Sequence, residues 1–282
     1  MTQNVTGTQL FAGQAVADCH MHFYDEKYPA SPDAVLFPPN ATPAMYSELT
    51  GALGIERTVV VQPTTYGLDN SCQLDGMAEL ERSRGAGFVR GVMVVNADTP
   101  ISELEHMHAA GVRGARFHML PGGAVDWDQL VPVAQKIAEF GWHIQLQMNS
   151  RGLPEKLQTL LDLPTDVVVD HVGRFMPPVS ADDPAFVALL TLIETKGWVK
   201  LSAPYESSVT GPEQYADLDP LVSALIEQVG DKALWASNWP HPGQTSPPNA
   251  SHLASLTKRW IPDTAMAQRI LIDNPARLYG FG

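Results

Sequence analysis

Two histidines, His20 and His22, stand two residues apart in the segment VADCHMHF. Side chains two apart on a strand point to the same face, so both imidazoles would project from one side of an apolar strand. A strand that ends in two histidines is hard to explain by packing alone, because a buried imidazole needs polar partners. Neutral imidazoles can accept a proton, polarise a carbonyl group or hold a metal ion. This pair is therefore the first candidate for chemistry.

A third histidine and an amide follow two later apolar runs. His171 comes directly after VVVD in the segment DHVGRF, and Asn238 follows LWAS in SNWPHP. In an α/β barrel the ends of all strands meet at one face, and barrel enzymes build their sites there from several strand ends. We therefore expect these two residues to meet the histidine pair of the first strand.

The elements that must position these residues are short apolar runs alternating with amphipathic segments. Runs such as TVVVQ, DVVVD and FVRGVMVV are apolar throughout, as in strands buried on both faces. Eight candidate strands cover residues 16–22, 57–62, 88–95, 113–117, 142–147, 166–170, 198–201 and 233–237. The segments between them predict helices at 44–53, 72–84, 101–109, 127–140, 153–161, 184–195, 215–229 and 251–260. Eight strand–helix pairs in succession predict an α/β fold, a (β/α)8 TIM barrel, with an extra C-terminal helix at 264–272 on the outside.

The domain organisation that follows is a single barrel over residues 15–282, preceded by an N-terminal extension over residues 1–14. An open doubly wound sheet is the alternative, but its first strand normally leads into a glycine-rich phosphate turn. Here the first strand ends in CHMHF, and the sequence holds neither GxGxxG nor GxxxxGK. Two proline-containing loops, 24–42 and 240–250, follow strand ends, where a barrel has its active site.

Composition excludes several classes of function. The 282 residues carry 31 acidic and 18 basic side chains, a formal charge of −13, so nucleic acids and anionic membranes would be repelled. Hydrophobic residues make up 44% and charged residues 17%, as in globular proteins. No apolar run approaches the roughly 20 residues that span a bilayer, and the N-terminal segment lacks the pattern of a secretory signal. With two cysteines, Cys19 and Cys72, and no CxxC spacing, we expect a cytoplasmic protein.

Three motifs resemble those of the amidohydrolase superfamily: HxH on the first strand, DHxGR on the sixth and [D/N]WPH on the eighth. More narrowly, the chain resembles the 2-pyrone-4,6-dicarboxylate lactonase group, which includes sugar-lactone lactonases and D-galactarolactone isomerase. VVVQPTTYGLDN, GARFHMLPGGAV, VKLSAPYESS and DNPARLYGF fit the same pattern, so the resemblance covers nearly the whole chain from Asp18 to Phe281. The segments LPGGAV, YESS and NWPH look closest to D-galactarolactone isomerase.

The resemblance implies a site that works with or without a metal. In metal-dependent amidohydrolases the first-strand histidines, a later histidine and a last-strand aspartate bind divalent ions. In the lactonase group the histidines polarise the lactone carbonyl and the aspartate activates water, without a metal. Here the aspartate position holds Asn238, a poor metal ligand and no base, whose NH2 can donate to an oxyanion or hold a substrate hydroxyl. We therefore expect no cofactor, with zinc on His20, His22 and His171 as the alternative.

The reaction expected is attack on the carbonyl of a small carboxylated lactone. Hydrolytic ring opening ranks first because lactonases dominate the group. Ring isomerisation by intramolecular acyl transfer follows closely, because Asn238 removes the base for water and a substrate hydroxyl gains from effective molarity. A metal-dependent hydrolase or decarboxylase, and a binding protein without turnover, are the remaining alternatives.

Substrate recognition needs cations, which an acidic chain has in small number. Arg116 stands where lactonases of this group bind a substrate carboxylate, and a guanidinium suits that task. The other expected substrate-binding residues are Gln62, Tyr66, Asn70, His118, Gln147, Asn149, Arg174, Tyr205, Trp239 and His241. The expected partner is the small-molecule lactone; barrels often self-associate, so a homo-oligomer is a further expectation, although no sequence patch marks an interface.

Overall fold

Eight parallel strands form one sheet whose order follows the chain from β1 to β8. The structure is a computed structural model that describes residues 9–11, 14–211 and 214–281, so most of the expected extension over 1–14 lies outside the described residues. The strands are β1 (Val16–Met21), β2 (Ile55–Val61), β3 (Val89–Met93), β4 (Val112–His118), β5 (His143–Gln147), β6 (Val167–Val169), β7 (Gly197–Leu201) and β8 (Ala233–Trp235). The expected TIM barrel is confirmed, with most strand bounds shifted by one or two residues.

The barrel closes between its first and last strands. Met21 pairs with Trp239 in a parallel bridge, and the backbone N–H of Asn238 donates to the backbone carbonyl of His20 at 2.9 Å. The amide of His22 donates to the carbonyl of Trp239 at 2.8 Å. These hydrogen bonds place the end of β1 and the start of the loop after β8 side by side, with their functional residues adjacent.

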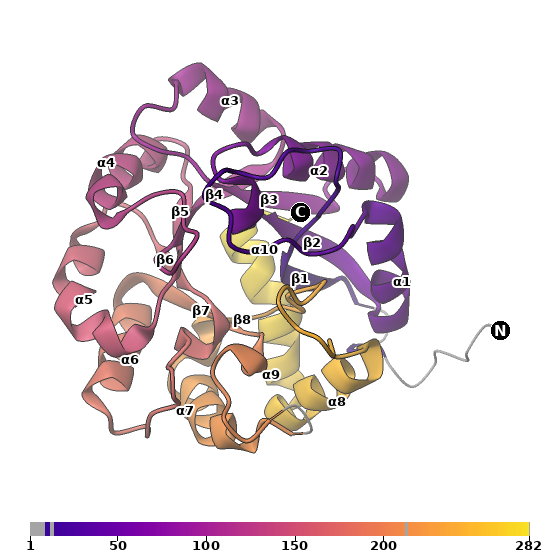
Figure 1. Ribbon diagram of the computed structural model, residues 1–282. Helices are drawn as coiled ribbons and strands as arrows, with labels where there is room; N and C mark the ends of the chain where they lie inside the picture. Colours follow the sequence, from indigo (N-terminus) through magenta and orange to yellow (C-terminus); the bar gives the residue numbers. More distant parts are fainter. Residues whose placement is uncertain (1–8, 12–13, 212–213, 282) are drawn as a thin grey trace.

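The helices pack around the sheet, as Figure 1 shows in a view into the barrel. They are α1 (Pro43–Leu53), α2 (Ser71–Arg84), α3 (Ile101–Ala109), α4 (Trp127–Ala138), α5 (Leu153–Asp162), α6 (Pro184–Lys196), α7 (Asp219–Val229) and α8 (Ala250–Trp260). Valines of the strands, such as Val59, Val60 and Val61, are fully buried, because helices cover one face and the barrel interior the other. None of the helices in the described ranges is long and apolar enough to cross a membrane.

The C-terminal segment is helical over the expected range 264–272 and continues beyond it. It forms α9 (Thr264–Gln268), a wider helical turn over Arg269–Asp273 and then α10 (Asn274–Tyr279). Tyr279 and Phe281 pack with barrel-interior side chains such as Ala17 and Val168. The segment therefore continues past 272 and its end contributes to the apolar core at the amino ends of the strands, opposite the face where the histidines lie.

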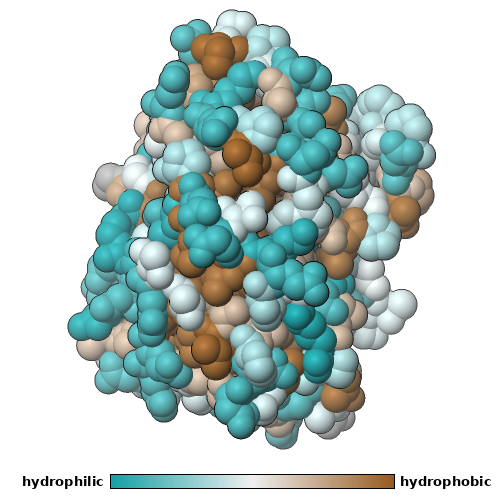
Figure 2. Space-filling model, turned by 90° about the vertical axis from the view of Figure 1, so that its left-hand side faces the viewer, coloured by the Kyte–Doolittle hydropathy of each residue, from teal (hydrophilic) through white to brown (hydrophobic). Residues whose placement is uncertain are grey.

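The flank that carries α4, α5 and α6 is mostly hydrophilic. Figure 2 shows apolar side chains there in small groups among hydrophilic ones. Such scattered apolar groups are ordinary on a protein surface. This flank therefore offers no apolar patch that would support the expected homo-oligomer.

Candidate active site

A pocket of about 310 Å³ opens at the carboxyl ends of the strands, a size suited to a small ligand. Its polar walls come from five strand ends or the loops after them: His22, Arg116, Gln147, His171, Arg174 and Asn238. His118 and Glu206 line it as well. The four residues expected to meet from three separate strands therefore do so, with His20 directly behind this wall.

The backbone at the site is held in an unusual conformation. His171, Arg174 and Asn238 have φ angles of 57°, 48° and 59°, in the left-handed region that side-chain-bearing residues rarely adopt. His241 joins them with a φ of 66°. Such residues cluster at functional sites, where the surrounding structure compensates the strain. Here the strained backbone turns two strand ends so that His171 and Asn238 line the pocket.

His20 and His22 form a contact between two neutral rings. The Nε2 atoms lie 3.2 Å apart, and Nδ1 of His22 lies 2.7 Å from the carbonyl oxygen of Val61. A carbonyl only accepts, so Nδ1 of His22 carries the proton and its Nε2 is bare. Burial holds the pKa of both histidines well below the usual value of 6.5, so both are neutral at pH 7.

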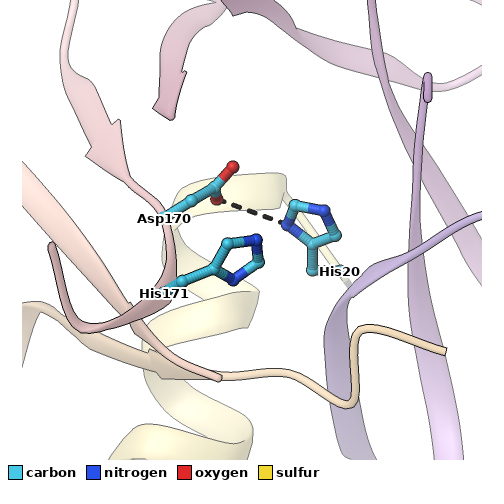
Figure 3. Close-up of side chains that lie close together, drawn as sticks. All are labelled: His20, Asp170 and His171. Carbon is cyan, nitrogen blue, oxygen red and sulfur yellow. Dashed lines mark ion pairs between the residues drawn. The ribbon is translucent and has the colours of Figure 1, made fainter. Parts of the chain in front are cut away.

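His171 completes the histidine group from the end of β6. Its ring lies beside that of His20 (Figure 3), with the two ring centres 4.9 Å apart. Its Nδ1 lies 2.9 Å from the hydroxyl of Ser202. Burial lowers the pKa of His171 to about 4. The pocket is thus lined at its inner end by neutral imidazoles, which can donate or accept a proton without carrying charge.

A charged cluster, absent from the sequence-level predictions, lies beneath the histidines. Asp170 lies 3.3 Å from Nδ1 of His20, and the ammonium of Lys200 lies 3.5 Å from the same carboxylate oxygen. Gln145 connects both, since it accepts from Lys200 at 2.5 Å and donates to Asp170 at 3.1 Å. Burial alone would raise the pKa of Asp170, but His20 and Lys200 hold it well below 3.8. The cluster therefore carries a buried ion pair next to His20.

The side-chain oxygen of Asn238 is free to accept a hydrogen bond. The amide nitrogen donates to the hydroxyl of Tyr205 at 2.8 Å, and that hydroxyl lies 3.1 Å from Nδ1 of His241. The side-chain oxygen of Asn238 is buried and has no hydrogen-bond partner among the described residues. Tyr205 takes one of the two amide hydrogens, so the NH2 keeps a donor for either expected role, and the unpaired oxygen adds an acceptor for a substrate hydroxyl.

Arg116 is buried in the pocket wall and hydrogen-bonds to neutral groups. One terminal nitrogen donates to the backbone carbonyl of Gln62 at 2.6 Å and the other to the side chain of Gln147 at 2.7 Å. Its Nε is buried without a partner within the described ranges. Arg174, by contrast, pairs with Glu206 at 2.8 Å. Arg116 is therefore the pocket cation whose charge no directly bound carboxylate compensates.

The profile of the amidohydrolase family matches residues 17–281. The chain belongs to the amidohydrolase family. This membership confirms the resemblance inferred from the three histidine-containing motifs.

Two relatives of this amidohydrolase are named for a pyrone dicarboxylate and for a lactone. The chain is 34% identical to 2-pyrone-4,6-dicarboxylate hydrolase of Comamonas testosteroni, over 96% of this chain and 91% of that one. It is 33% identical to D-galactarolactone isomerase of Agrobacterium fabrum strain C58, over 94% and 91%. An apo crystal structure from Agrobacterium tumefaciens matches with a TM-score of 0.88 and 32% identity, over 95% of this chain and 97% of that one.

The donor set of this amidohydrolase suits a divalent cation poorly. His20, Asp170 and His171 each offer a ligand atom within 4.8 Å of the others. However, the ammonium of Lys200 lies 3.3 Å from Nδ1 of His20 and already balances the Asp170 carboxylate. A second cation a few ångströms from a buried ammonium would be repelled. At the last strand, the ligand position holds the neutral amide of Asn238.

Some expected substrate-binding residues support the loops around the pocket instead of lining it. Gln62 donates to the carbonyls of Gly67 and Asp69, and Asn70 exchanges two hydrogen bonds with the backbone of Val94. The side-chain amide of Asn70 and the NH2 of Gln62 therefore bind backbone groups, as polar residues after a strand commonly do. The side-chain oxygen of Gln62 is buried without a partner among the described residues.

Tyr66 and Asn149 are likewise placed outside the pocket. The Tyr66 hydroxyl accepts from the amide of Asp25 at 2.9 Å, and Asn149 accepts from the amides of Arg151 and Met176. Sequence reasoning placed them by their position after a strand, which does not reveal whether a side chain turns inward or back onto its own loop.

Trp239 and His241 line a neighbouring, more apolar groove of about 810 Å³. Trp239 packs on Tyr46 with ring centres 5.2 Å apart. Tyr205 contacts the site only indirectly, because its hydroxyl accepts a hydrogen bond from the side chain of Asn238. His118, Gln147 and Arg174 do line the pocket as expected. Burial lowers the pKa of His118 to about 3, so this ring is neutral too.

Proposed function

We propose that this amidohydrolase attacks the carbonyl of a small carboxylated lactone without a metal. The observation that carries the proposal is the placement of neutral His22 and His171 in one pocket with Arg116, a buried cation bound only to neutral groups. A guanidinium with spare donors suits a substrate carboxylate. The names of the relatives, a pyrone dicarboxylate hydrolase and a galactarolactone isomerase, support a lactone as the substrate class.

Ring isomerisation is the outcome that the pocket favours. In this reaction a substrate hydroxyl attacks the lactone carbonyl, and a new C–O bond forms while the ring C–O bond breaks. The hydroxyl proton passes to His22 and then to the departing alkoxide, so that no water is consumed. Holding nucleophile and carbonyl in one molecule supplies effective molarity, which lowers the demand on the base.

Hydrolysis, ranked first at the sequence level, stays a prediction and makes greater demands on the site. Incoming water needs a base, and a positioned base contributes about 10²–10⁴ in rate. The last-strand position holds Asn238, and Glu206, which lines the pocket, is paired with Arg174 at 2.8 Å. The unpaired oxygen of Asn238 is instead suited to orient a substrate hydroxyl.

The test is a panel of carboxylated lactones followed by proton NMR in ¹⁸O-enriched water, with product masses recorded. The proposal predicts a change of ring size without incorporation of the label. Label in an open-chain acid would show that water is the nucleophile and would return hydrolysis to first place. Asn149→Ala serves as a matched control, because this residue lies outside the pocket. Binding of lactones without turnover by the native chain would contradict the proposal.

A further inference from the structure

Lys200 is a fully buried cation that does not line the pocket. Its side chain extends from β7 and has an exposed fraction of 0%. The ammonium lies 2.5 Å from the side-chain oxygen of Gln145 and 3.3 Å from Nδ1 of His20. A buried charge destabilises the fold unless it is well paired. Nothing in the proposed reaction so far gives this residue a task.

The contacts of His20 define which of its ring nitrogens carries the proton. Because Nε2 of His22 is bare, the 3.2 Å contact between the two Nε2 atoms is a hydrogen bond only if His20 is the donor. The Lys200 ammonium lies 3.3 Å from Nδ1 of His20 and can only donate, so this Nδ1 must be bare and accept. Facing it at 3.3 Å are two donors, the Lys200 ammonium and the amide nitrogen of Gln145.

The opposite tautomer would be disfavoured at both ends of the ring. A proton on Nδ1 of His20 would face an ammonium and an NH2 group, while two bare Nε2 atoms would meet at 3.2 Å. Asp170 Oδ1 lies 3.3 Å from Nδ1 and, among the described residues, is the one acceptor there that favours this tautomer. Two donors face the same nitrogen and the contact with His22 requires a proton on Nε2, so we expect the carboxylate to compensate charge without setting the tautomer.

Lys200 also fixes the second donor. An ammonium only donates, so it requires the oxygen of Gln145, and this turns the NH2 of Gln145 toward Asp170 and His20. Without the ammonium, the amide of Gln145 is free to turn over and offer its oxygen to His20 instead. Lys200 thus determines which atoms donate and which accept in the hydrogen bonds that join it to Gln145, His20 and His22.

We infer that Lys200 is a positioning residue that holds His20 in the Nε2–H tautomer and so supplies the pocket's inner end with a donor. This inference rests on the proposed function. A carbonyl oxygen that enters beside His22 takes the Nε2–H of His20, and Nε2 of His22 is released to accept the substrate proton. His20 thus becomes the hydrogen-bond donor to the carbonyl oxygen as His22 becomes free to act as the base. Lys200 acts through His20 and does not touch the substrate.

The first test measures the tautomer itself in the free protein. In protein with ¹⁵N-labelled histidine, two-bond ¹⁵N–¹H correlations distinguish a protonated from a bare ring nitrogen, and loss of signals in His20→Gln assigns the ring. The native protein is expected to show a protonated Nε2 and a bare Nδ1. In Lys200→Met we expect Nδ1 to become protonated. A protonated Nδ1 in the native protein, or an unchanged pattern in Lys200→Met, would overturn the inference.

Two further variants separate positioning from folding. Lys200→Met leaves Asp170 buried without its cation, so the double variant Lys200→Met/Asp170→Asn removes both charges and is expected to recover stability. Asp170→Asn alone keeps the lysine and should keep the native tautomer. If Lys200 had a purely structural role, the double variant would recover kcat together with stability, and this result would also overturn the inference.

Kinetics on a lactone substrate give a second readout. Because Lys200 does not line the pocket, Lys200→Met and the double variant should lower kcat by roughly 10²-fold, the loss typical of one oxyanion donor, with KM unchanged. A rise in KM with unchanged kcat would contradict the assigned role. If the native protein turned over no lactone, the proposed function would fail, whereas the NMR experiment would still decide the role of Lys200.

Discussion

At the scale of single residues, Asn238 separates two reactions that share one pocket. Its NH2 is bound by Tyr205 and its oxygen is unpaired, so it can orient a hydroxyl but cannot remove a proton. The neutral histidines and Arg116 suit either reaction equally. We propose that this one side chain decides whether water or a substrate hydroxyl is the nucleophile.

Replacement of Asn238 by Asp tests that assignment. In Asn238→Asp a carboxylate would stand at the end of β8 beside the pocket and serve as a base for water. We expect hydrolysis to rise on the order of 10²-fold, the lower range of what a positioned base contributes. The readout is ¹⁸O in the open acid, with Asn238→Ala as the variant that has neither amide nor carboxylate. Unlabelled product at the native rate from Asn238→Asp would refute the role given to this position.

Residue types with a distinct chemical signature were predictable from sequence. His20, His22, His171 and Arg116 stand out because imidazoles and a guanidinium at the ends of apolar strands have no packing reason to be there. Lys200 was not predicted, although a lysine inside the apolar run GWVKL is a comparable signal. Its long side chain can reach solvent from many strand positions, so sequence alone does not reveal that it points into the barrel.

At the scale of elements, the site depends on how β1 is joined to the segment after β8. Asp18 on β1 accepts from the amide and hydroxyl of Ser237, from the hydroxyl of Tyr46 and from the amide of His20. Burial raises its pKa above the usual 3.8. The carboxylate therefore ties together the two elements that carry His20 and Asn238.

Asp18→Asn is expected to destabilise the fold and weaken activity together. Its NH2 would face donors where the carboxylate accepts, and unsatisfied buried groups cost about 1–3 kcal/mol each. We expect the free energy of unfolding to fall by roughly 2–4 kcal/mol in urea titrations. Asp98→Asn, at an exposed position, is the matched control. A variant as stable as the control would show that the barrel closes without this carboxylate.

Element types were predicted more reliably than element ends. The apolar runs identified all eight strands because parallel strands buried on both faces have no alternating pattern. β6 was predicted at 166–170 and spans Val167–Val169, since the sequence marks apolar character and not the last ladder hydrogen bond. The C-terminal helix expected at 264–272 continues as α10 to Tyr279, because periodicity identifies an apolar stripe but not how far the chain stays helical. Tyr279, beyond the expected end, packs inside the barrel.

At the scale of the whole molecule, the net charge is negative, whereas the active site contains several cations. The chain carries a formal charge of −13, yet Arg116 and Arg174 line the pocket and Lys200 lies beneath it. Local cations in an acidic protein attract a carboxylate at short range, while the net charge discourages polyanions. This contrast fits a small carboxylated substrate.

The most direct test of metal-free carbonyl attack is the turnover rate after exhaustive dialysis against a chelator. Metal content is measured by elemental analysis, and circular dichroism verifies that the dialysed protein remains folded. The account predicts substoichiometric metal and an unchanged kcat, because neutral histidines and the Lys200–Asp170 pair supply the polarity that an ion would otherwise provide. Loss of activity on dialysis, with recovery on addition of one equivalent of zinc, would contradict it.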